Sequence, residues 1–367
     1  MHLYVFWRVI GLSVVNSSRR RNLVLGVFGL LWLTFLVGLF YGHDGSGFLA
    51  APLEMFNLQV FGLLFIVSLP LLLVDLVTGF GFLFREYKSR LRSVALALGL
   101  LLTLFALFQG MRAPVMQYHT VYLSNLPQEL DKTTLVAISD THIGSILGAD
   151  WLDDRVTQVM KQKPDLIFIL GDFLEGHGTQ YTGDLLPILK RLETPLGIWA
   201  VPGNHDSYGS DNQSLKLLEK AGVRVLRYQS VQIQDGFNLI GFDDDGWGDQ
   251  SDETAESKTA AANRHSDFMA KTFARLPDGV TIVISHEPKT VLEAEKAGVD
   301  LMLSAHTHGG QIWPFDYLVQ SRYPYLEGRY EFEKMSLIVT RGAGTWGPLM
   351  RLWQPGEILH ITLRKGE

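Results

Sequence analysis

The sequence predicts a layered α/β domain that follows an N-terminal region of about three transmembrane helices. Three long apolar runs lie before residue 114, and short apolar bursts alternate with helix-like stretches through the rest of the 367 residues. Hydrophobic residues make up 47% of the chain and the mean hydropathy is +0.13, which is high for a wholly soluble protein. We therefore expect a membrane anchor at residues 1–114 and a globular domain at residues 115–367.

The three apolar runs occupy residues 22–41, 55–76 and 93–110, and each is about long enough to cross a hydrocarbon core as a helix. Buried core helices are the alternative, but they suit runs of about 10 to 14 residues better. The first 15 residues are apolar and contain Arg8, so a further span, an interfacial helix and a signal-like segment all remain open. No small-residue cleavage site follows them, and we interpret them as an uncleaved anchor. Asp75 is expected at the interface rather than buried among the helices.

The short loops predict an orientation. Arginines at positions 19–21 precede the first run and four basic residues follow the second run between positions 85 and 92, whereas residues 42–54 contain neither Lys nor Arg. By the positive-inside rule the two basic loops face the cytoplasm, so the third span exits outward. The sequence thus predicts a multi-pass protein of the cell (inner) membrane whose domain after residue 111 is extracytoplasmic.

Charge and cysteine content exclude several classes of function. Residues 1–114 contain nine of the 32 Lys and Arg residues and four of the 38 Asp and Glu residues, which gives the anchor a net charge of +5. The remainder of the chain has a net charge of −11. An acidic domain without a basic stripe is a poor match for nucleic acid. The chain has no cysteine, which excludes disulfides and thiolate metal sites. Transport through the helices lacks support because the spans have few polar residues and no internal repeat.

After residue 114 the pattern predicts strands alternating with helices, which indicates a layered α/β fold. A long surface loop near the site is expected at residues 243–264. The expected strands are residues 135–138, 166–170, 197–201, 239–240, 280–284, 301–303 and 337–339. The expected helices are residues 151–162, 184–192, 214–221 and 290–297.

Side chains that can bind metal follow five of these strands directly. In chain order they are Asp140 and His142, Asp172, Asn204 beside His205, His286, and His306 with His308. Ligand sites in layered α/β folds lie outside the carboxyl ends of the strands, so all five clusters should converge. Carboxylate oxygen and neutral imidazole nitrogen suit divalent cations, and one carboxylate can bridge two of them. Each residue alone has a structural alternative as a helix cap or turn residue, but the five clusters together disfavour it.

At these residues the sequence resembles the calcineurin-like metallophosphoesterases, whose pattern is D-x-H, G-D, G-N-H-[DE], a lone H and then H-x-H. Every element is present in order between Asp140 and His308. Ala305 replaces the glycine that often precedes the last motif. Residues 309–311 (GGQ) and 341–348 (RGAGTWGP), with Arg351, resemble the membrane-anchored bacterial branch of that family. The resemblance implies a sandwich of two central mixed sheets flanked by helices.

The resemblance also implies a dinuclear metal site. One ion would be bound by Asp140, His142 and His308, the other by Asn204, His286 and His306, with Asp172 bridging them. Manganese, iron and zinc all suit these ligands, and manganese is favoured. A water held between the cations would lose a proton near neutral pH and attack phosphorus. His205, the family's non-ligand histidine, would stabilise the transition state or protonate the leaving alkoxide.

Four further residues are weaker candidates. Arg341 and Arg351 could donate to a substrate phosphate, but an arginine beside a tryptophan more often packs its stem and pairs with an acid, and we favour that alternative for both. His177 and Asp244 lie in loops that could border the pocket, with the same preference for a structural role.

The function predicted by the sequence is that of a membrane-anchored phosphoesterase that hydrolyses a phosphate mono- or diester. Tethering by the spans makes a phospholipid or lipid-linked headgroup a plausible substrate. The alternative is a catalytically inactive scaffold of the same fold, which would typically have lost metal ligands, whereas here all seven are present together with His205. The substrate, the choice between monoester and diester, and the oligomeric state are left open by the sequence.

Overall fold

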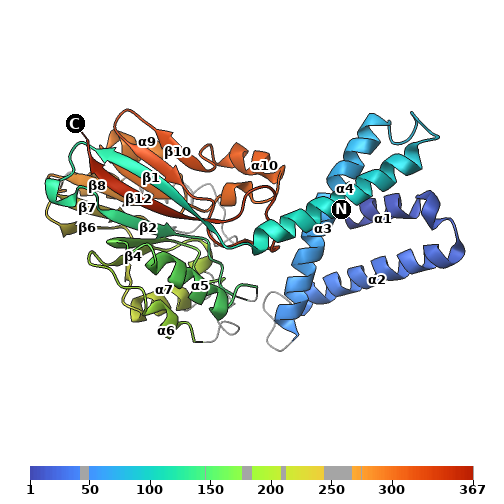
Figure 1. The fold of residues 1–367 in the computed structure, drawn as a ribbon, viewed down its shortest axis with the longest axis horizontal. Coiled ribbons are helices and arrows are strands. Elements are labelled where there is room, and N and C mark those ends of the chain that lie inside the picture. The colour runs from blue at the N-terminus through green and yellow to red at the C-terminus, as the bar shows by residue number, and fades with distance from the viewer. Residues whose placement is uncertain are drawn as a thin grey trace. The chain divides into compact units, whose positions relative to one another are not determined.

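The computed structural model describes residues 1–41, 49–144, 146–175, 184–207, 212–243, 267–273 and 275–366 (Figure 1). Within it the chain forms two compact units. Unit 1 comprises Met1–Arg112 together with Gly347–Pro355, and unit 2 comprises Ala113–Trp346 together with Gly356–Glu367. The sequence predicted one boundary near residue 114, and the structure adds a nine-residue segment far along the chain to the helical unit.

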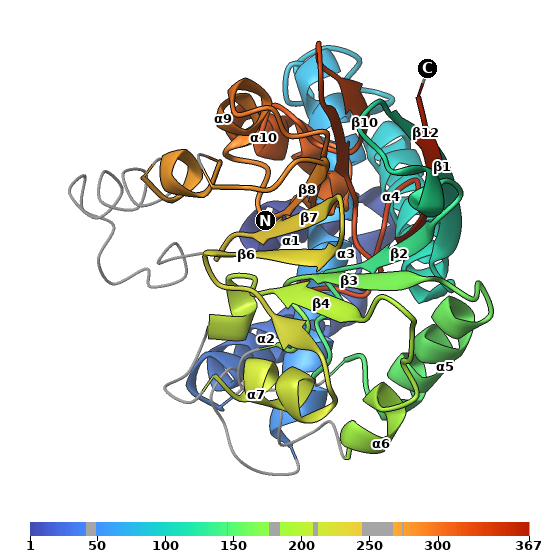
Figure 2. The same ribbon diagram turned by 90° about the vertical axis from the view of Figure 1, so that its left-hand side faces the viewer.

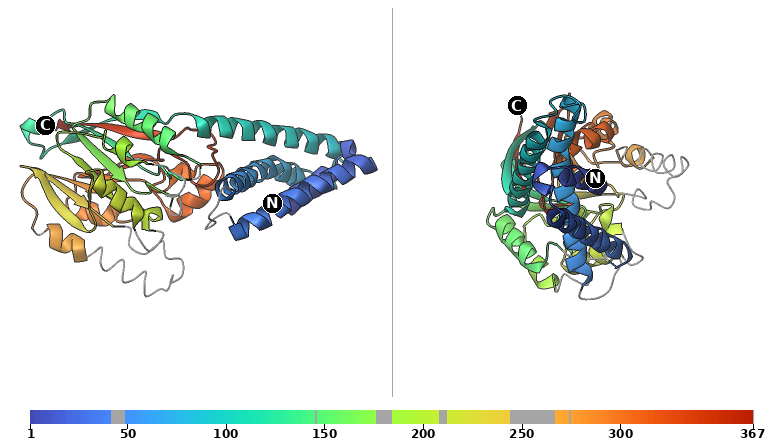
Figure 3. Two further views of the ribbon diagram at one scale, coloured as in Figure 1. Left: turned by 90° about the horizontal axis from the view of Figure 1, so that it is seen from below. Right: turned by 90° about the vertical axis from the view of Figure 1, so that its right-hand side faces the viewer.

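Unit 1 is built on three long helices, α2 (Ser18–Tyr41), α3 (Ala50–Val77) and α4 (Lys88–Met111). At about 1.5 Å per residue each is longer than the roughly 30 Å hydrocarbon core. Each is also apolar enough to cross a membrane, as the sequence predicted. Helices α3 and α4 (Figure 3) pack closely at Gly99, which has no side chain. A Cβ at this position would lie only 2.8 Å from the Val67 Cα atom.

The short helix α1 (His2–Ile10) packs on these helices but is too short to cross a bilayer. Its nine residues extend about 14 Å, less than half of the hydrocarbon thickness. Val5 is buried in an apolar cluster with Leu64 and Val67 of α3 and Ala95 of α4. Helix α1 is therefore not a further complete transmembrane span, which was one of the alternatives that the sequence left open.

Asp75 is fully buried among α1, α3 and α4, in contrast to the interfacial position that the sequence favoured. Its carboxylate accepts hydrogen bonds from the Tyr4 hydroxyl at 2.6 Å and from Arg92 Nε and Nη2 at 3.0 and 2.9 Å. Arg8 Nε forms an ion pair with it at 2.5 Å. The buried acid is therefore compensated by two arginines, which is the condition under which such a charge is tolerated.

The segment Gly347–Pro355 belongs to unit 1 through direct contacts with α3 and α4. The Arg351 amide donates to the Ala106 carbonyl at 2.9 Å, and a Cβ at Gly110 would lie 2.7 Å from the Leu349 carbonyl oxygen. A Cβ at Gly62 would likewise lie 2.7 Å from the Met350 sulfur. The glycines of the two helices thus make room for this segment.

Unit 2 contains two six-stranded mixed sheets packed face to face (Figures 1 and 2). The core between them combines Leu135 and Phe168 of the first sheet with Leu239 and Ile282 of the second. The first sheet has the order β1 (Val115–Leu123), β12 (Glu357–Lys365), β2 (Thr134–Ile138), β3 (Leu166–Leu170), β4 (Ile198–Val201) and β5 (Arg224–Val225). The second has the order β10 (Gly328–Glu331), β11 (Ser336–Val339), β9 (Leu301–Ser304), β8 (Val280–Ile284), β7 (Phe237–Gly241) and β6 (Gln229–Gln234).

Parallel pairing brings the site-forming strands to common edges. Strands β2, β3 and β4 are parallel neighbours in the first sheet, and β7, β8, β9 and β11 are parallel neighbours in the second. The carboxyl ends of parallel strands share one edge, where ligand sites of such folds lie. Helices α5 (Ala149–Met160), α6 (Leu186–Leu189), α7 (Gln213–Lys220), α9 (Val291–Lys296) and α10 (Phe315–Arg322) flank the sheets (Figure 2).

All seven predicted strands and all four predicted helices of this unit are confirmed, with small differences at their ends. Strands β1, β5, β6, β10 and β12 and helix α10 were not predicted. The edge strand β1 has several exposed or half-buried residues and so lacks a long apolar burst. Of the predicted loop at residues 243–264, only Asp243 lies within the described residues; His177 and Asp244 lie outside them.

Candidate metal centre

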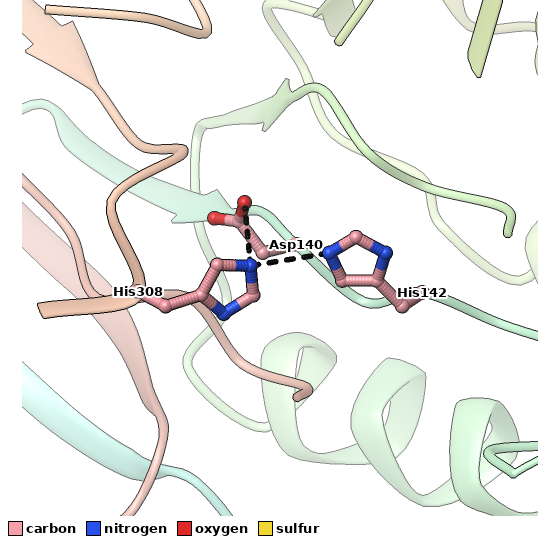
Figure 4. Close-up of side chains that lie close together, drawn as sticks. All are labelled: Asp140, His142 and His308. Atoms are coloured by element: carbon pink, nitrogen blue, oxygen red, sulfur yellow. Dashed lines mark hydrogen bonds and ion pairs between the residues drawn. The ribbon is translucent and has the colours of Figure 1, made fainter. Parts of the chain in front are cut away.

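The five predicted clusters come together at the carboxyl ends of β2, β3, β4, β8 and β9. Asp140, His142 and His308 form the first group, in which suitable ligand atoms all lie within 4.8 Å of one another (Figure 4). His308 Nε2 is 3.1 Å from His142 Nε2 and 3.5 Å from Asp140 Oδ1. All three side chains are buried. The first group therefore presents two imidazole nitrogens and a carboxylate oxygen to one point.

Asp172, His286 and His306 form the second group, and Asn204 joins it through its contact with His286. His286 Nε2 lies 3.2 Å from Asp172 Oδ2, 3.1 Å from His306 Nδ1 and 3.2 Å from Asn204 Oδ1. The other ring nitrogen of His286, Nδ1, is 2.7 Å from the Leu170 carbonyl and donates to it. That hydrogen bond fixes the tautomer and leaves the Nε2 lone pair directed at the group.

Asp172 stands between the two groups. Its Oδ2 atom is 3.2 Å from His286 Nε2 in the second group and 3.7 Å from His142 Nε2 in the first. Its Oδ1 atom accepts the His205 backbone amide at 2.8 Å, which fixes the carboxylate. One oxygen that faces both groups is the arrangement expected of a carboxylate that bridges two cations.

The residues fit a pair of divalent cations. Asp140 Oδ1 is buried and accepts no hydrogen bond from any residue that the structure describes. Burial raises the pKa of Asp140, because a carboxylate without a cation is poorly solvated there. Burial and the adjacent His286 hold the pKa of His306 well below its usual range, so its ring is neutral and can donate a lone pair. Carboxylate, amide oxygen and imidazole together suit manganese, iron or zinc.

Five of these side chains are attached to a left-handed backbone, at Asp140, His142, Asp172, His306 and His308, with φ between 44° and 70°. Such a conformation costs an ordinary residue about 1 kcal/mol. Strain of this kind clusters at functional sites, where the surrounding structure compensates it. The sharp turns at the strand ends allow neighbouring side chains such as His306 and His308 to enter the two adjoining groups.

Glycines allow the close approach of these turns. A Cβ at Gly171 would lie 2.6 Å from His286 Nδ1, and a Cβ at Gly203 would overlap the Asp172 carboxylate. A Cβ at Gly342 would lie 2.6 Å from the Asp140 Cβ. The glycines of the G-D and G-N-H motifs are thus required by packing against the metal-binding side chains.

Glu175, which the sequence analysis missed, connects His142 with His205. Its Oε2 atom is 2.6 Å from His142 Nδ1, and its Oε1 atom is 2.8 Å from His205 Nδ1. Burial alone would lower the pKa of His142, but the Glu175 carboxylate raises it to about 9. Burial acts to raise the pKa of Glu175, and His142 more than offsets this, so the pKa is lowered. The only sequence feature that could have indicated Glu175 is its position, an acidic residue three positions after Asp172 of the G-D motif.

Around His205 the structure holds the ring in one orientation. Its Nδ1 atom faces Glu175, and its ring packs edge-on against Trp346 with centroids 6.4 Å apart. The neighbouring Asp206 is buried and accepts the Gly203 amide at 3.0 Å. His205 lies beside the first group, with its ring centroid 4.8 Å from that of His142. Together with His142 and Glu175 it forms a third cluster of potential ligand atoms.

Tyr323 is a second residue that the sequence analysis missed. Its hydroxyl is 3.0 Å from His306 Nε2 and 3.2 Å from Glu287 Oε2. Because His306 Nδ1 faces His286, the contact with Tyr323 fixes the opposite side of the ring. No motif marks Tyr323 in the sequence, since it lies just after a helix that was not predicted.

The contacts of the two candidate substrate-binding arginines are those of residues with a structural role. Arg341 Nη1 forms ion pairs with Glu357 at 2.9 Å and Glu327 at 3.5 Å, which is the acid pairing that the sequence analysis favoured. Arg351 is buried within unit 1, where its amide bonds to α4.

The comparisons with known proteins agree with this geometry. Residues 133–310 match the family model of the calcineurin-like phosphoesterases. An uncharacterized metallophosphoesterase of Helicobacter pylori is 31% identical over 258 residues, covering 70% of this chain and 65% of that protein. One of Campylobacter jejuni is 30% identical over 291 residues, covering 76% and 72%. A transmembrane protein with metallophosphoesterase domain of Danio rerio is 26% identical over 283 residues, covering 74% and 62%.

The chain belongs to the calcineurin-like metallophosphoesterase family. It spans just under two thirds of the length of the Helicobacter relative. Its residues 133–310 form the family's phosphoesterase domain, and three of its helices are long and apolar enough to cross a membrane.

Proposed function

We propose that the chain is a membrane-anchored phosphoesterase with a dinuclear metal site that hydrolyses a phosphate mono- or diester. The observation that supports this most directly is the position of Asp172 Oδ2, within 3.7 Å of the first group of ligands and 3.2 Å of the second. One ion would be held by Asp140, His142 and His308, and the other by Asn204, His286 and His306. Asp172 would contact both.

Bound cations would supply charge neutralisation of the phosphate and a lowered pKa for water. The remaining work is done by side chains of the protein. Glu175 holds His205 through Nδ1 and so fixes the orientation of the ring beside the first group. From there His205 would donate a proton to the leaving oxygen or a hydrogen bond to the developing charge.

The anchor motivates a proposal about substrate. A site tied to membrane-spanning helices meets phosphates at the bilayer surface at a high effective concentration, so a phospholipid or other lipid-linked headgroup is the proposed ester. Manganese is the proposed metal, because carboxylate, amide and imidazole ligands without thiolate suit it.

A substrate panel tests these proposals together. The purified full chain is reconstituted with Mn, Fe or Zn and assayed on lipid phosphodiesters, lipid monophosphates and soluble nucleotides. Activity confined to soluble substrates would exclude the lipid proposal. Absence of any bound divalent ion in a metal analysis would favour the alternative, a catalytically inactive scaffold of the same fold.

His205→Ala serves as the control variant in that panel. We expect turnover to fall by about 10²- to 10⁴-fold, the usual contribution of a general acid. Metal content should stay unchanged, because both ion sites proposed above are complete without His205, which clusters instead with Glu175 and His142. Loss of metal together with activity would mean that His205 is a ligand and that its proposed role is wrong.

The positive-inside rule supports an extracytoplasmic position for the domain in the cell (inner) membrane, with the chain crossing the membrane several times. The chain lacks cysteine, so a single introduced thiol reports the side unambiguously. The substitution Asp150→Cys places this thiol in the exposed first turn of α5. It should react with an impermeant maleimide in intact spheroplasts, and protection until lysis would place the domain in the cytoplasm.

A further inference from the structure

Helix α10 (Phe315–Arg322) lies beside the metal centre and has no buried residue. Large apolar side chains on and next to it are exposed, including Tyr317 at 64%, Leu318 at 62% and Trp346 at 51%. Trp313 and Phe315 are exposed as well. We call Trp313, Phe315, Tyr317, Leu318 and Trp346 the α10 face. A soluble domain rarely exposes so many large apolar side chains together unless they contact something.

The α10 face is held firmly to the turn that bears His306 and His308. At the start of the helix, the missing side chain of Gly310 lets the backbone of Asp316 approach, since a Cβ there would lie 2.7 Å from the Asp316 amide nitrogen. At its end, the Tyr323 hydroxyl contacts His306 Nε2 at 3.0 Å. Anything that binds this face is therefore placed next to the site.

Trp346 is fixed to the same surface through Gln311. The Gln311 side chain donates to the Trp346 carbonyl at 2.9 Å and accepts its amide at 2.9 Å. The Trp346 ring also packs edge-on against His205. Through Trp346 the α10 face thus contacts the histidine that we propose as the proton donor.

We infer that the α10 face is a bilayer-contact surface, whose tryptophan, tyrosine, phenylalanine and leucine side chains enter the headgroup region. Trp and Tyr prefer that region because their rings combine an apolar body with a polar edge. The bilayer is the occupant already tied to this domain, since the same chain contains three helices able to cross it. Trp346 is joined by one peptide bond to Gly347, the first residue of the segment that packs on α3 and α4.

This contact would determine which phosphates reach the metal centre. A face that enters the headgroup region brings esters of the lipid surface to the site, whereas soluble esters gain nothing from it. The inference concerns the surface itself and does not depend on the proposed substrate, so it can be tested without an activity assay.

Site-directed spin labelling of the full chain in nanodiscs of phosphatidylethanolamine and phosphatidylglycerol tests the contact. Because the chain has no cysteine, Leu318→Cys and Tyr317→Cys each give one labelling site. Leu292→Cys on α9 and Tyr122→Cys on β1 are matched controls in the same domain, at positions that are 51% and 65% exposed. Collisions of each label with oxygen, which concentrates in lipid, are compared with collisions with a water-soluble nickel chelate.

We expect the ratio of oxygen to nickel collisions to be several-fold higher at positions 317 and 318 than at both controls. Equal ratios at all four positions would overturn the inference. Labels at 317 and 318 that are shielded from both reagents would also overturn it, because that result indicates a protein partner or a second copy of the chain. Two positions are used so that a perturbing label at one does not decide the outcome.

Discussion

Replacing Glu175 by glutamine tests the geometry of the site most directly. The carboxylate accepts from His142 at 2.6 Å and from His205 at 2.8 Å, one oxygen for each ring. An amide has one acceptor oxygen, and its NH₂ group cannot accept from the second ring. In Glu175→Gln one of the two histidines must therefore lose its charge-assisted hydrogen bond.

The size of the effect follows from that one bond. A hydrogen bond to a charged group contributes about 1.5 to 3 kcal/mol. At about 1.4 kcal/mol per factor of ten, kcat/KM should fall by about tenfold to a hundredfold if the loss is felt in the transition state. The fold should be retained, since the substitution preserves the shape of the side chain.

The assay is steady-state kinetics on metal-loaded full-length protein, combined with metal analysis. A fall in turnover with full metal content assigns the loss to His205, whereas loss of metal assigns it to His142. Glu129→Gln, at an exposed position in the same domain, is the control and should behave as wild type. Wild-type kcat/KM in Glu175→Gln at full metal content would refute the positioning role of Glu175.

Three further outcomes are expected. Asp75→Asn leaves two buried guanidinium groups without a counter-charge, which should destabilise the protein by about 3–5 kcal/mol. Thermal unfolding in detergent measures this effect, with the exposed Asp150→Asn variant as the control. An unchanged Tm for Asp75→Asn would contradict the prediction. Gly203→Ala places a methyl group against the Asp172 carboxylate, so bound metal and activity should both drop. Gly148→Ala, whose methyl group meets nothing within 4 Å, should retain both. The His142 pKa is raised to about 9 in the metal-free protein, and protons compete with cations for its ring. The metal affinity of the first site should therefore fall by up to about tenfold for each pH unit below 9, and calorimetric titrations at several pH values that show no such slope would argue against the raised pKa.

The same shift also makes the stability of the metal-free protein depend on pH. His142 has a higher pKa when folded than its usual value of 6.5, so its contribution is complete below about pH 6.5 and is lost as the pH rises through about 9. Glu175 has a lowered pKa, so its contribution is present above its usual value of 4.5 and is lost as the pH falls toward the lowered value. The pair should therefore stabilise the metal-free protein most between about pH 4.5 and 6.5.

The convergence of the candidate metal-binding residues could be predicted from the sequence because strand ends have a simple signature. A buried parallel strand is a mainly apolar run, as in β3 and β8, and the first polar residues after it lie at the sheet edge. Asp172 and His286 occupy those positions. The spacing within each motif is short, so local sequence is sufficient to place these side chains.

Glu175 and Tyr323 could not be predicted in the same way. Their partners, His142 and His306, lie 33 and 17 residues away in sequence, and the contact depends on how loops from separate strands meet. Strands β1 and β12 were missed for a related reason, because β1 alternates buried and exposed positions and gains its stability by parallel pairing with the distant β12. Long-range pairing leaves little trace in a local pattern.

Residues 341–344 (RGAG), part of the segment that resembles the membrane-anchored branch of the family, support the backbone at Asp140. The Ala343 amide donates to the Ser139 carbonyl at 2.9 Å, and the Gly344 amide donates to the Asp140 carbonyl at 3.0 Å. With the missing side chain of Gly342 against Asp140 Cβ, this backbone holds Asp140 in its left-handed conformation. Arg341 in turn pairs with Glu357 at the start of β12, which fixes the loop to the first sheet. The motif thus acts on Asp140 through backbone hydrogen bonds and close backbone packing, which explains why glycine is needed at positions 342 and 344.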